Sequence, residues 1–349
     1  MLNSVAGIDA TRIKHWLEKN VPGATAPFDY ELITGGHSNL TYSVVDTDGR
    51  RFALRRPPLG TVLASAHDMA REHRLISSLA GTAVPVPLAL GLCEDPEVIG
   101  VPFYVMEFVN GTVLRNNQMS STLFDEAARG AASESLVSTL AAIHSVDVDA
   151  VGLGDLGARE SYVPRQLRRW KRQWDAQKTR DLPMVDRTHA RLADRVPDQR
   201  GATIVHGDFK IDNCLLTGSG PDCGKVIAVL DWEICALGDP LADLGMLLAY
   251  WEQPGEAPIL WPDGATQVPG FLNRSEIARL YGEVTGRDMS QLSFYIAFAY
   301  WKLACIIEGV YGRYLSGGLS GASDEQLACF KGQVETAVQC ADNLLDSLS

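Results

Sequence analysis

The chain has 349 residues, which is enough for one large or two smaller domains with a substantial buried core. Its 43 acidic residues outnumber its 31 lysines and arginines, giving a formal net charge of −12. This charge argues against a general nucleic-acid-binding protein, which needs a basic surface to neutralise phosphates. Hydrophobic residues make up 46% of the chain and charged residues 21%, a composition that argues against disordered and fibrous classes.

Cysteine usage and hydropathy predict a cytoplasmic protein without a membrane partner. Seven cysteines are scattered without a Cys-x-x-Cys pair, so neither a disulfide framework nor a structural zinc site is expected. The N-terminus has no basic region followed by a long apolar run, and we expect no signal peptide. The longest apolar region, 294–307, contains Lys302 and falls short of the roughly 20 apolar residues that a membrane span needs.

The first hundred residues predict a short helix and a small sheet. Asp9 is a suitable N-cap for the helix. A long helix is expected over 67–80, and two more strands are expected in the segment that ends near Phe108. Three earlier strands, joined by a glycine-containing loop and a turn, are predicted over 30–34, 40–46 and 51–56.

After Asn110-Gly111 the pattern becomes mostly helical. A short β-rich segment over 202–231 interrupts it. We therefore predict two domains, an N-lobe of residues 1–109 and a helical C-lobe of residues 110–349. The expected helices of the C-lobe cover 121–145, 161–176, 240–252, 274–285, 289–315 and 324–347.

Polar residues with the chemistry of phosphoryl transfer follow two short strands of the β-rich segment. Residues 203–216 read TIVHGDFKIDNCLL, so that Asn213 lies five positions after Asp208, and a later strand leads to Asp231 and Glu233. Phosphoryl transfer needs a carboxylate to take the proton of the attacking hydroxyl, and oxygen ligands to hold Mg²⁺ against the phosphates. The rest of the catalysis is positioning and charge neutralisation.

The motifs HGDFKIDN, LDWE and LGDPLADLG resemble the aminoglycoside phosphotransferase and choline kinase family, a branch of the protein-kinase-like fold. The resemblance covers most of the chain from about Leu32 onward. The segments FALRRPP, REHRLISSL and YVMEFVNG are similar to one sub-branch, which includes kinase-like domains fused to certain animal acyl-CoA dehydrogenases. The resemblance implies a bilobal α+β fold with a small antiparallel-sheet N-lobe that binds nucleotide. It also implies a larger, mostly helical C-lobe with the catalytic loop and the acceptor pocket.

The resemblance implies a role for each polar residue of the motifs. Asp208 matches the catalytic base, and Lys210 matches a lysine that meets the γ-phosphate. Asn213 and Asp231 match the Mg²⁺ ligands, and Glu233 could add a water-mediated contact to the metal.

The resemblance also places a nucleotide site in the N-lobe. A glycine loop covers the phosphates, a basic residue of the third strand pairs with a helix glutamate, and a hinge lies beside the base of the nucleotide. The matching candidates are Gly35, Gly36, Ser38, Asn39, Arg55, Glu72, Glu107 and Val109.

Two features depart from the kinase pattern. Arg55 stands where a kinase usually has lysine; arginine keeps the charge but presents a planar fork. The loop Gly-Gly-His-Ser-Asn over 35–39 is not Gly-x-Gly-x-x-Gly, and a plain hairpin turn is the alternative interpretation.

Several candidates have a structural interpretation beside the functional one. His206 is either an acid/base or a buried ring that orients the loop, and we favour the ring. We interpret Asp239 as a helix N-cap and expect Asp243 to bond the catalytic-loop backbone, rather than either binding a metal. The basic segment 166–180 either grips an anionic substrate or forms an amphipathic helix, which we favour. Aromatic residues of the helix over 289–315 line either the acceptor pocket or the core.

The sequence thus predicts an ATP- or GTP-dependent, Mg²⁺-dependent phosphotransferase that acts on a hydroxyl of a small molecule. A hydroxyacyl compound or another metabolic alcohol ranks above an aminoglycoside as acceptor. The alternative is a catalytically silent nucleotide-binding or scaffolding protein, supported by Arg55 and the unusual glycine loop. We identify no flavin-binding signature in the sequence, so an acyl-CoA dehydrogenase activity is not expected.

Overall fold

The computed structural model describes residues 5–33, 39–59, 68–256, 263–317 and 323–348. The chain forms two compact units. The first comprises Met1–Gly111, Val151–Leu153 and Ile227–Glu233, and the second comprises Thr112–Ala150, Gly154–Val226 and Ile234–Ser349. The segment that carries Asp231 therefore packs with the first unit, in which the Val229 N–H donates to the Pro85 carbonyl at 2.8 Å.

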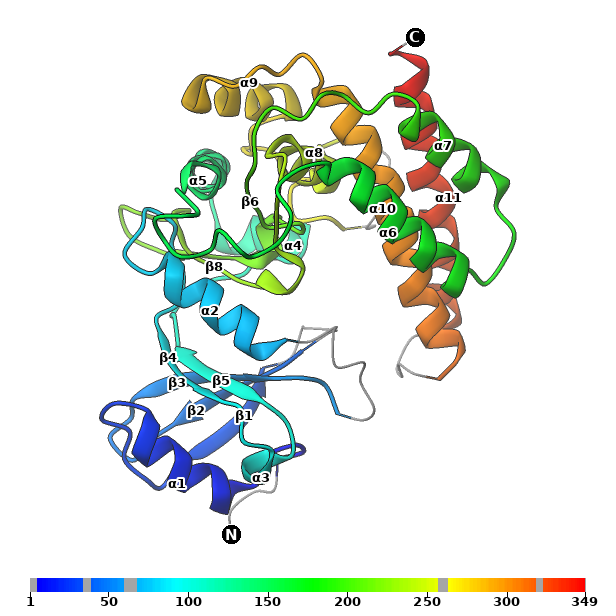
Figure 1. Ribbon diagram of the computed structural model, residues 1–349. Coiled ribbons are helices and arrows are strands. Elements are labelled where there is room, and N and C mark those ends of the chain that lie inside the picture. Colours follow the sequence, from blue (N-terminus) through cyan, green and yellow to red (C-terminus); the bar gives the residue numbers. More distant parts are fainter. Residues whose placement is uncertain (1–4, 34–38, 60–67, 257–262, 318–322, 349) are drawn as a thin grey trace. The chain divides into compact units, whose positions relative to one another are not determined.

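The described part of the first unit contains a five-stranded antiparallel sheet in the order β1-β2-β3-β5-β4 (Figure 1). This sheet and its strand positions confirm the fold class expected from the sequence. The strands are β1 (Asp29–Ile33), β2 (Leu40–Val45), β3 (Arg51–Arg56), β4 (Ala89–Cys93) and β5 (Phe103–Glu107). The helices are α1 (Ala10–Asn20), α2 (Met69–Leu79) and the short α3 (Pro96–Ile99).

The two faces of this sheet carry different side chains because neighbouring residues of a strand point to opposite sides. Leu54 and Phe103 belong to an apolar cluster that includes Ile13 and Leu17 of α1. Arg55 and Tyr104, each one residue further along, are paired in register and lie on the opposite face. Alternation thus delivers a cation and a phenol to the face that α2 covers.

The second unit is mostly helical (Figure 1). Phe124 and Asp125 separate α4 from α5 where one helix was expected, since Asp125 caps α5 by accepting the Ala128 N–H. The helix α7 was not predicted; it begins with Pro183, which is tolerated in a first turn because that N–H has no helical partner. The helices are α4 (Asn117–Leu123), α5 (Glu126–Ser145), α6 (Tyr162–Gln177), α7 (Pro183–Ala193), α8 (Leu241–Tyr250), α9 (Arg274–Thr285), α10 (Leu292–Leu315) and α11 (Asp324–Asp346).

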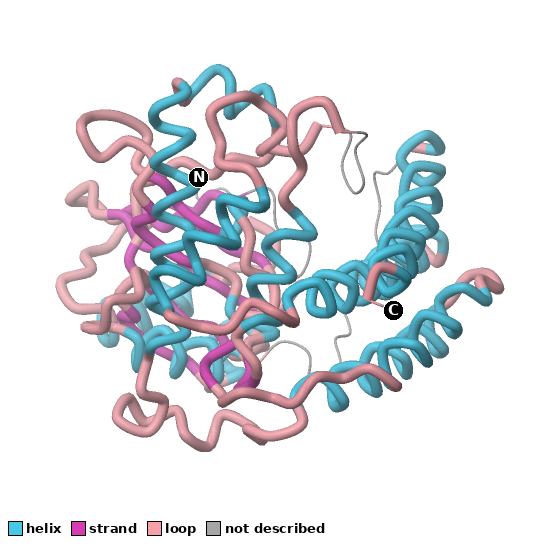
Figure 2. The backbone as a smooth tube through the Cα atoms, turned by 90° about the horizontal axis from the view of Figure 1, so that it is seen from above, coloured by secondary structure: helices cyan, strands magenta, loops and turns pink. Residues whose placement is uncertain are grey.

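The helix α10 forms the centre of the second unit. It packs against α6, α8 and α11, and Figure 2 shows the long helices near the C-terminus lying side by side. By length and composition α10 is apolar enough to cross a membrane, unlike the shorter region judged from the sequence, but most of its apolar window is buried inside the protein. Core helices pass the same test, so this is weak evidence for a membrane span.

Short elements position the motif residues. The strand β6 (Thr203–Val205) pairs antiparallel with β9 (Ala236–Gly238) and leads directly into the HGD segment. A 3₁₀ turn, η1 (Ile211–Asn213), places Asn213 just before β7 (Cys214–Leu216). The strand β8 (Val226–Val229) precedes Asp231, and the 3₁₀ turn η2 (Trp232–Ile234) follows it.

Candidate active site

The loop after β6 is held by a buried carboxylate of α8. Asp243 is fully buried and accepts the His206 N–H at 2.6 Å and the Gly207 N–H at 2.7 Å. Burial alone raises the pKa of Asp243, but the hydrogen bonds that its carboxylate makes with the His144 ring and the Gly207 N–H outweigh burial and hold the pKa below its ordinary value. The expected contact between Asp243 and the loop backbone is confirmed.

The His206 ring orients the same loop. It is fully buried, and its Nδ1 accepts the Asp208 N–H at 3.3 Å. These contacts are those of an orienting ring, the interpretation favoured from the sequence.

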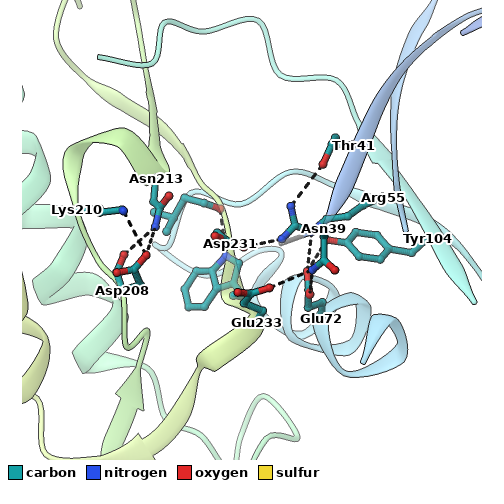
Figure 3. A network of polar contacts seen from close by, with 12 residues as sticks. Asn39, Thr41, Arg55, Glu72, Tyr104, Asp208, Lys210, Asn213, Asp231 and Glu233 are labelled. Atoms are coloured by element: carbon teal, nitrogen blue, oxygen red, sulfur yellow. Dashed lines mark hydrogen bonds and ion pairs between the residues drawn. The ribbon is translucent and has the colours of Figure 1, made fainter. Parts of the chain in front are cut away.

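The Asp208 carboxylate is gripped at both oxygens. Its Oδ1 accepts from the Tyr250 hydroxyl at 2.9 Å, and its Oδ2 accepts from Asn213 Nδ2 at 3.0 Å. The Asn213 amide also donates to the Asp208 carbonyl at 2.8 Å, and Lys210 Nζ lies 3.5 Å from Oδ2 (Figure 3). The predicted base, lysine and amide therefore form one cluster in the second unit.

Tyr250 is a member of this cluster that the sequence analysis missed. It ends α8, and its ring lies 4.7 Å from Lys210 Nζ, so that it contacts both predicted catalytic residues. Burial and the neighbouring Asp208 carboxylate raise the pKa of the phenol well above its ordinary value, which keeps Tyr250 a hydrogen-bond donor. The only signal in the sequence is its place at the end of the helix that begins with LADLG.

A second cluster lies in the first unit and centres on Arg55. Arg55 Nε donates to Glu72 Oε2 at 2.9 Å, and its Nη2 lies 2.5 Å from Asp231 Oδ1 (Figure 3). Glu72 also accepts from the Tyr104 hydroxyl at 3.1 Å. Asn39 Nδ2 donates to Glu72 at 3.0 Å and to Glu233 at 3.2 Å. Arg55 thus joins the helix glutamate to the predicted metal ligand.

Electrostatics in this cluster favour a charged Arg55. Burial alone lowers the pKa of the guanidinium, but the carboxylates of Glu72, Asp231 and Glu233 outweigh it and raise the pKa. Burial raises the pKa of Glu72, and Arg55 partly offsets this effect. The Arg55–Glu72 pair is a buried ion pair, with side chains 13% and 3% exposed.

Asp231 has an unusual backbone conformation. Its φ of 66° lies in the left-handed region, which few non-glycine residues adopt, although Asp is among those enriched there. Such conformations gather at functional sites because the surrounding structure must hold them in place. The conformation supports a functional role for Asp231.

The remaining nucleotide candidates are placed only in part. Gly35, Gly36 and Ser38 lie outside the described residues. The Glu107 N–H, at the end of β5, donates to the Leu88 carbonyl at 2.8 Å and is therefore already engaged. A hinge contact to a nucleotide would fall to other backbone groups, such as those of the half-buried Val109.

The predicted magnesium ligands carry oxygen atoms, and each is described within its own unit. Within the described ranges no three or more His, Cys, Asp or Glu side chains gather as a metal-binding group. In the second unit Asn213 donates to Asp208 through Nδ2, so its amide oxygen keeps its acceptor capacity, and in the first unit the Asp231 carboxylate is paired with Arg55. Mg²⁺ is typically bound by one or two carboxylates together with substrate phosphates and waters, so each of these side chains is chemically suited to the role predicted for it.

Other candidates serve the fold. Asp239 accepts the Leu241 N–H at 3.0 Å, as a capping residue does, although α8 begins after Pro240. Trp170 and Trp174 are buried while Arg168 and Arg172 are exposed, which fits the amphipathic interpretation of α6. The aromatic side chains of α10 for which a pocket or a core role was open include Tyr295, Tyr300 and Trp301, and all three are buried. All seven cysteines are free thiols.

Comparison with known proteins identifies a family and a relative for this chain. The phosphotransferase enzyme family model matches residues 29–278. The chain is 36% identical over 318 residues to mouse acyl-CoA dehydrogenase family member 10, covering 89% of this chain and 29% of that protein. The chain therefore spans well under half the length of this curated relative.

Two solved structures share the fold. One, from Ralstonia eutropha and assigned as an aminoglycoside phosphotransferase, is 31% identical with a TM-score of 0.78, covering 96% of this chain and 98% of that one. The other is a thermostable mutant of aminoglycoside phosphotransferase APH(4)-Ia in a ternary complex with ADP and hygromycin B. It is 18% identical with a TM-score of 0.58, covering 94% of this chain and 97% of that one, and at this identity it shows the fold alone.

The family model covers more than half of the chain, and its range includes the Asp208 cluster, the Arg55 cluster and every predicted site residue. The chain therefore belongs to the phosphotransferase enzyme family.

Proposed function

We propose that this protein is a small-molecule kinase. It transfers the γ-phosphoryl group of ATP or GTP to a hydroxyl of a small molecule, with Asp208 as the base. The observation that carries the proposal is the geometry of Asp208, whose two carboxylate oxygens are fixed by Tyr250 and Asn213 on a loop that Asp243 holds. A pre-oriented carboxylate is what abstraction of a hydroxyl proton requires.

The proposed reaction balances without any redox partner. The acceptor oxygen forms a bond to the γ-phosphorus, the bond from that phosphorus to the bridging β–γ oxygen breaks, and ADP or GDP leaves. The acceptor proton passes to Asp208. Bound Mg²⁺ would neutralise charge on the phosphates, and Asn213, Asp231 and Glu233 are the residues proposed to hold it. Lys210 is proposed to meet the γ-phosphate.

Arg55 is proposed to act on the nucleotide side of the reaction. Its guanidinium keeps a positive charge, and its planar fork can engage a carboxylate and a phosphate oxygen together. The acceptor is proposed to be a hydroxyacyl compound or another metabolic alcohol, because the relative of 36% identity bears an acyl-CoA dehydrogenase name and not that of an antibiotic kinase.

One observation favours the rival function, a nucleotide-binding protein without turnover. Arg55 Nη2 lies 2.5 Å from Asp231, so the predicted metal ligand is already paired with a cation. The intact Asp208 cluster favours the enzyme. The rival predicts nucleotide binding in the absence of transfer.

The experiment that tests the function is a screen for nucleoside diphosphate release. ATP and GTP, each with Mg²⁺, are offered with hydroxyacyl-CoAs, choline-like amines and aminoglycosides, and thermal stabilisation by each nucleotide is measured in parallel. Acceptor-dependent release of ADP or GDP is expected. Stabilisation by Mg-ATP without release across a broad alcohol panel would support the rival function instead.

A further inference from the structure

A lysine ammonium is buried directly behind the catalytic loop. Lys302 lies on α10, is 5% exposed, and donates to the Gly207 carbonyl at 2.6 Å. The centroid of the Trp170 ring lies 5.5 Å from Nζ. Among the described residues no carboxylate forms an ion pair with it. A buried ammonium with a single neutral acceptor is an expensive arrangement for the fold.

The acceptor of Lys302 belongs to the peptide that carries Asp208. In the Gly207–Asp208 peptide the oxygen is held by Lys302, and the N–H is held by His206 Nδ1 at 3.3 Å. The preceding N–H, of Gly207, is held by Asp243 at 2.7 Å. The plane of this peptide is thus fixed at both ends, and with it the direction in which the Asp208 side chain leaves the backbone.

Gly207 needs this support more than an ordinary loop residue. Its φ of +88° is readily adopted only by glycine, and glycine has the most conformational freedom to lose. Ile234 lies 3.1 Å from the position that a Cβ would occupy, so the backbone also passes close to a neighbouring side chain. The Asp243 carboxylate accepts from the N–H of Gly207 and the Lys302 ammonium donates to its carbonyl, so groups of opposite charge hold the two sides of this residue.

We propose that Lys302 is a positioning residue for the base, which holds the Gly207–Asp208 peptide in the orientation that phosphoryl transfer requires and does so at the expense of stability. This inference rests on the proposed function, because it assigns a role toward Asp208 as base. It goes beyond that function in naming a buried residue of the C-terminal helices, 94 positions from the base, as necessary for turnover.

The charge state of Lys302 supports the proposal. Burial lowers the pKa of the ammonium to about 8. Asp208 from the catalytic loop and Asp243 from α8 act to raise it, and Arg169 from α6 acts to lower it. The protonated form is therefore retained at neutral pH and lost in mildly alkaline solution, where the neutral amine is a weaker donor to the Gly207 carbonyl.

The test compares Lys302→Met with the wild type and with Lys331→Met, a control on the exposed surface of α11. Removing the buried charge is expected to leave the melting temperature unchanged or higher, because relief from burying an ammonium outweighs the loss of one hydrogen bond to the Gly207 carbonyl. We expect kcat to fall about 10- to 100-fold, because small misplacements of reacting groups have effects of this order. The KM for nucleotide is expected to stay within about threefold, since Lys302 is not proposed to touch it.

A second readout does not depend on activity. Hydrogen exchange of the 206–208 amides is expected to quicken about tenfold or more in Lys302→Met, and not in the control, as local opening becomes easier. Lys302→Gln, which restores a donor without charge, covers the case in which the methionine variant fails to fold. It is expected to recover part of the protection.

The outcomes separate this inference from the proposed function. If the wild type turns over an acceptor and Lys302→Met has the same kcat, the positioning role is overturned and the kinase function is retained. If the wild type shows no turnover with any acceptor, the proposed kinase function is contradicted. The hydrogen-exchange measurement alone then decides whether Lys302 holds the loop. Unchanged exchange of the 206–208 amides in the Lys302 variants would overturn the positioning role of Lys302.

Discussion

The Tyr250 hydroxyl takes one of the two oxygens of the Asp208 carboxylate, and Asn213 takes the other. A carboxylate oxygen has more than one lone pair, so each keeps acceptor capacity while the orientation of the group is fixed. The raised pKa of the phenol makes Tyr250 a donor throughout the working pH range. It can therefore orient the base without competing for the acceptor proton.

Tyr250→Phe tests this role at the residue scale. The variant keeps the ring over Lys210 and removes only the hydroxyl. Loss of a hydrogen bond to a charged group corresponds to about 1.5–3 kcal/mol, so we expect kcat to fall roughly 10- to 100-fold.

The matched control for Tyr250→Phe is Tyr300→Phe. Tyr300 is a buried tyrosine of the same unit, and no hydrogen bond of its hydroxyl is found among the described residues. Its removal is expected to leave kcat unchanged. Equal kcat for the wild type and Tyr250→Phe would show that the phenol does not act on the base.

Local spacing explains which site residues the sequence could predict. Asp208 and Asn213 lie five positions apart on one loop, so their contact follows from the motif and a single 3₁₀ turn. Tyr250 and Lys302 reach the same loop only through the packing of α8 and α10. No local sequence pattern predicts such packing. In an apolar helix a tyrosine is interpreted as a core residue, and a lysine as an interruption of the apolar run.

At the scale of elements, strand alternation explains the Arg55 cluster. Arg55 and Tyr104 are register partners on β3 and β5, and both face α2, where Glu72 accepts a hydrogen bond from each. The planar fork of arginine lets one side chain bond Glu72 through Nε and Asp231 through Nη2. Lysine, as a single point charge, could not hold both in the same way.

Arg55→Met and Arg55→Lys test the cluster through stability. The methionine variant leaves Glu72, 3% exposed, without its cation. Breaking a buried pair by removing one partner costs about 3–5 kcal/mol of unfolding free energy. The lysine variant keeps a charge near Glu72 and is expected to lose less. Chemical denaturation measures both, and equal stability of the three proteins would contradict a buried ion pair.

Helices and strands with strong periodicity could be predicted from the sequence, but the positions where helices begin and end could not. The five strands of the sheet follow from alternating side chains and from the turns between them. The division of α4 from α5 depends on the cap that Asp125 provides, within a run that otherwise reads as one helix. The first turn of α7 contains Pro183, which from the sequence alone reads as a break and not as a start.

At the scale of the whole molecule, the buried charge of Lys302 predicts a pH-dependent stability. Its pKa is about 8 in the folded protein against an ordinary value of 10.5, so the unfolded chain binds the proton more tightly. Below about pH 8 both states carry the charge, and the folded state bears the full penalty of burying it. As the pH rises toward about 10.5 this penalty disappears.

The measurable consequence is a difference between two proteins, which cancels other titrating groups. The stability gain of Lys302→Met over the wild type is expected to be largest below about pH 8 and to shrink as the pH rises above it. Urea denaturation at pH 7, 8 and 9 gives this difference. A gain that stays constant, or grows with pH, would contradict a buried ammonium in the folded protein.

Whole-chain properties carried little information on the site. The net charge of −12 argued against nucleic-acid binding but says nothing of the individual cations around Asp208 and Asp231. The family followed from a few motif residues whose spacing phosphoryl transfer dictates. The acceptor does not follow from them, because its recognition depends on side chains that different segments bring together.

The most direct test of the central claim is acceptor-dependent release of nucleoside diphosphate by Asp208→Asn, with exposed Asp222→Asn as the matched control. We predict a loss of roughly 100-fold or more in kcat for Asp208→Asn, with thermal stabilisation by Mg-nucleotide retained, since a positioned base contributes about this much. The control is expected to match the wild type. Wild-type turnover by a well-folded Asp208→Asn protein would contradict the assignment of Asp208 as the base.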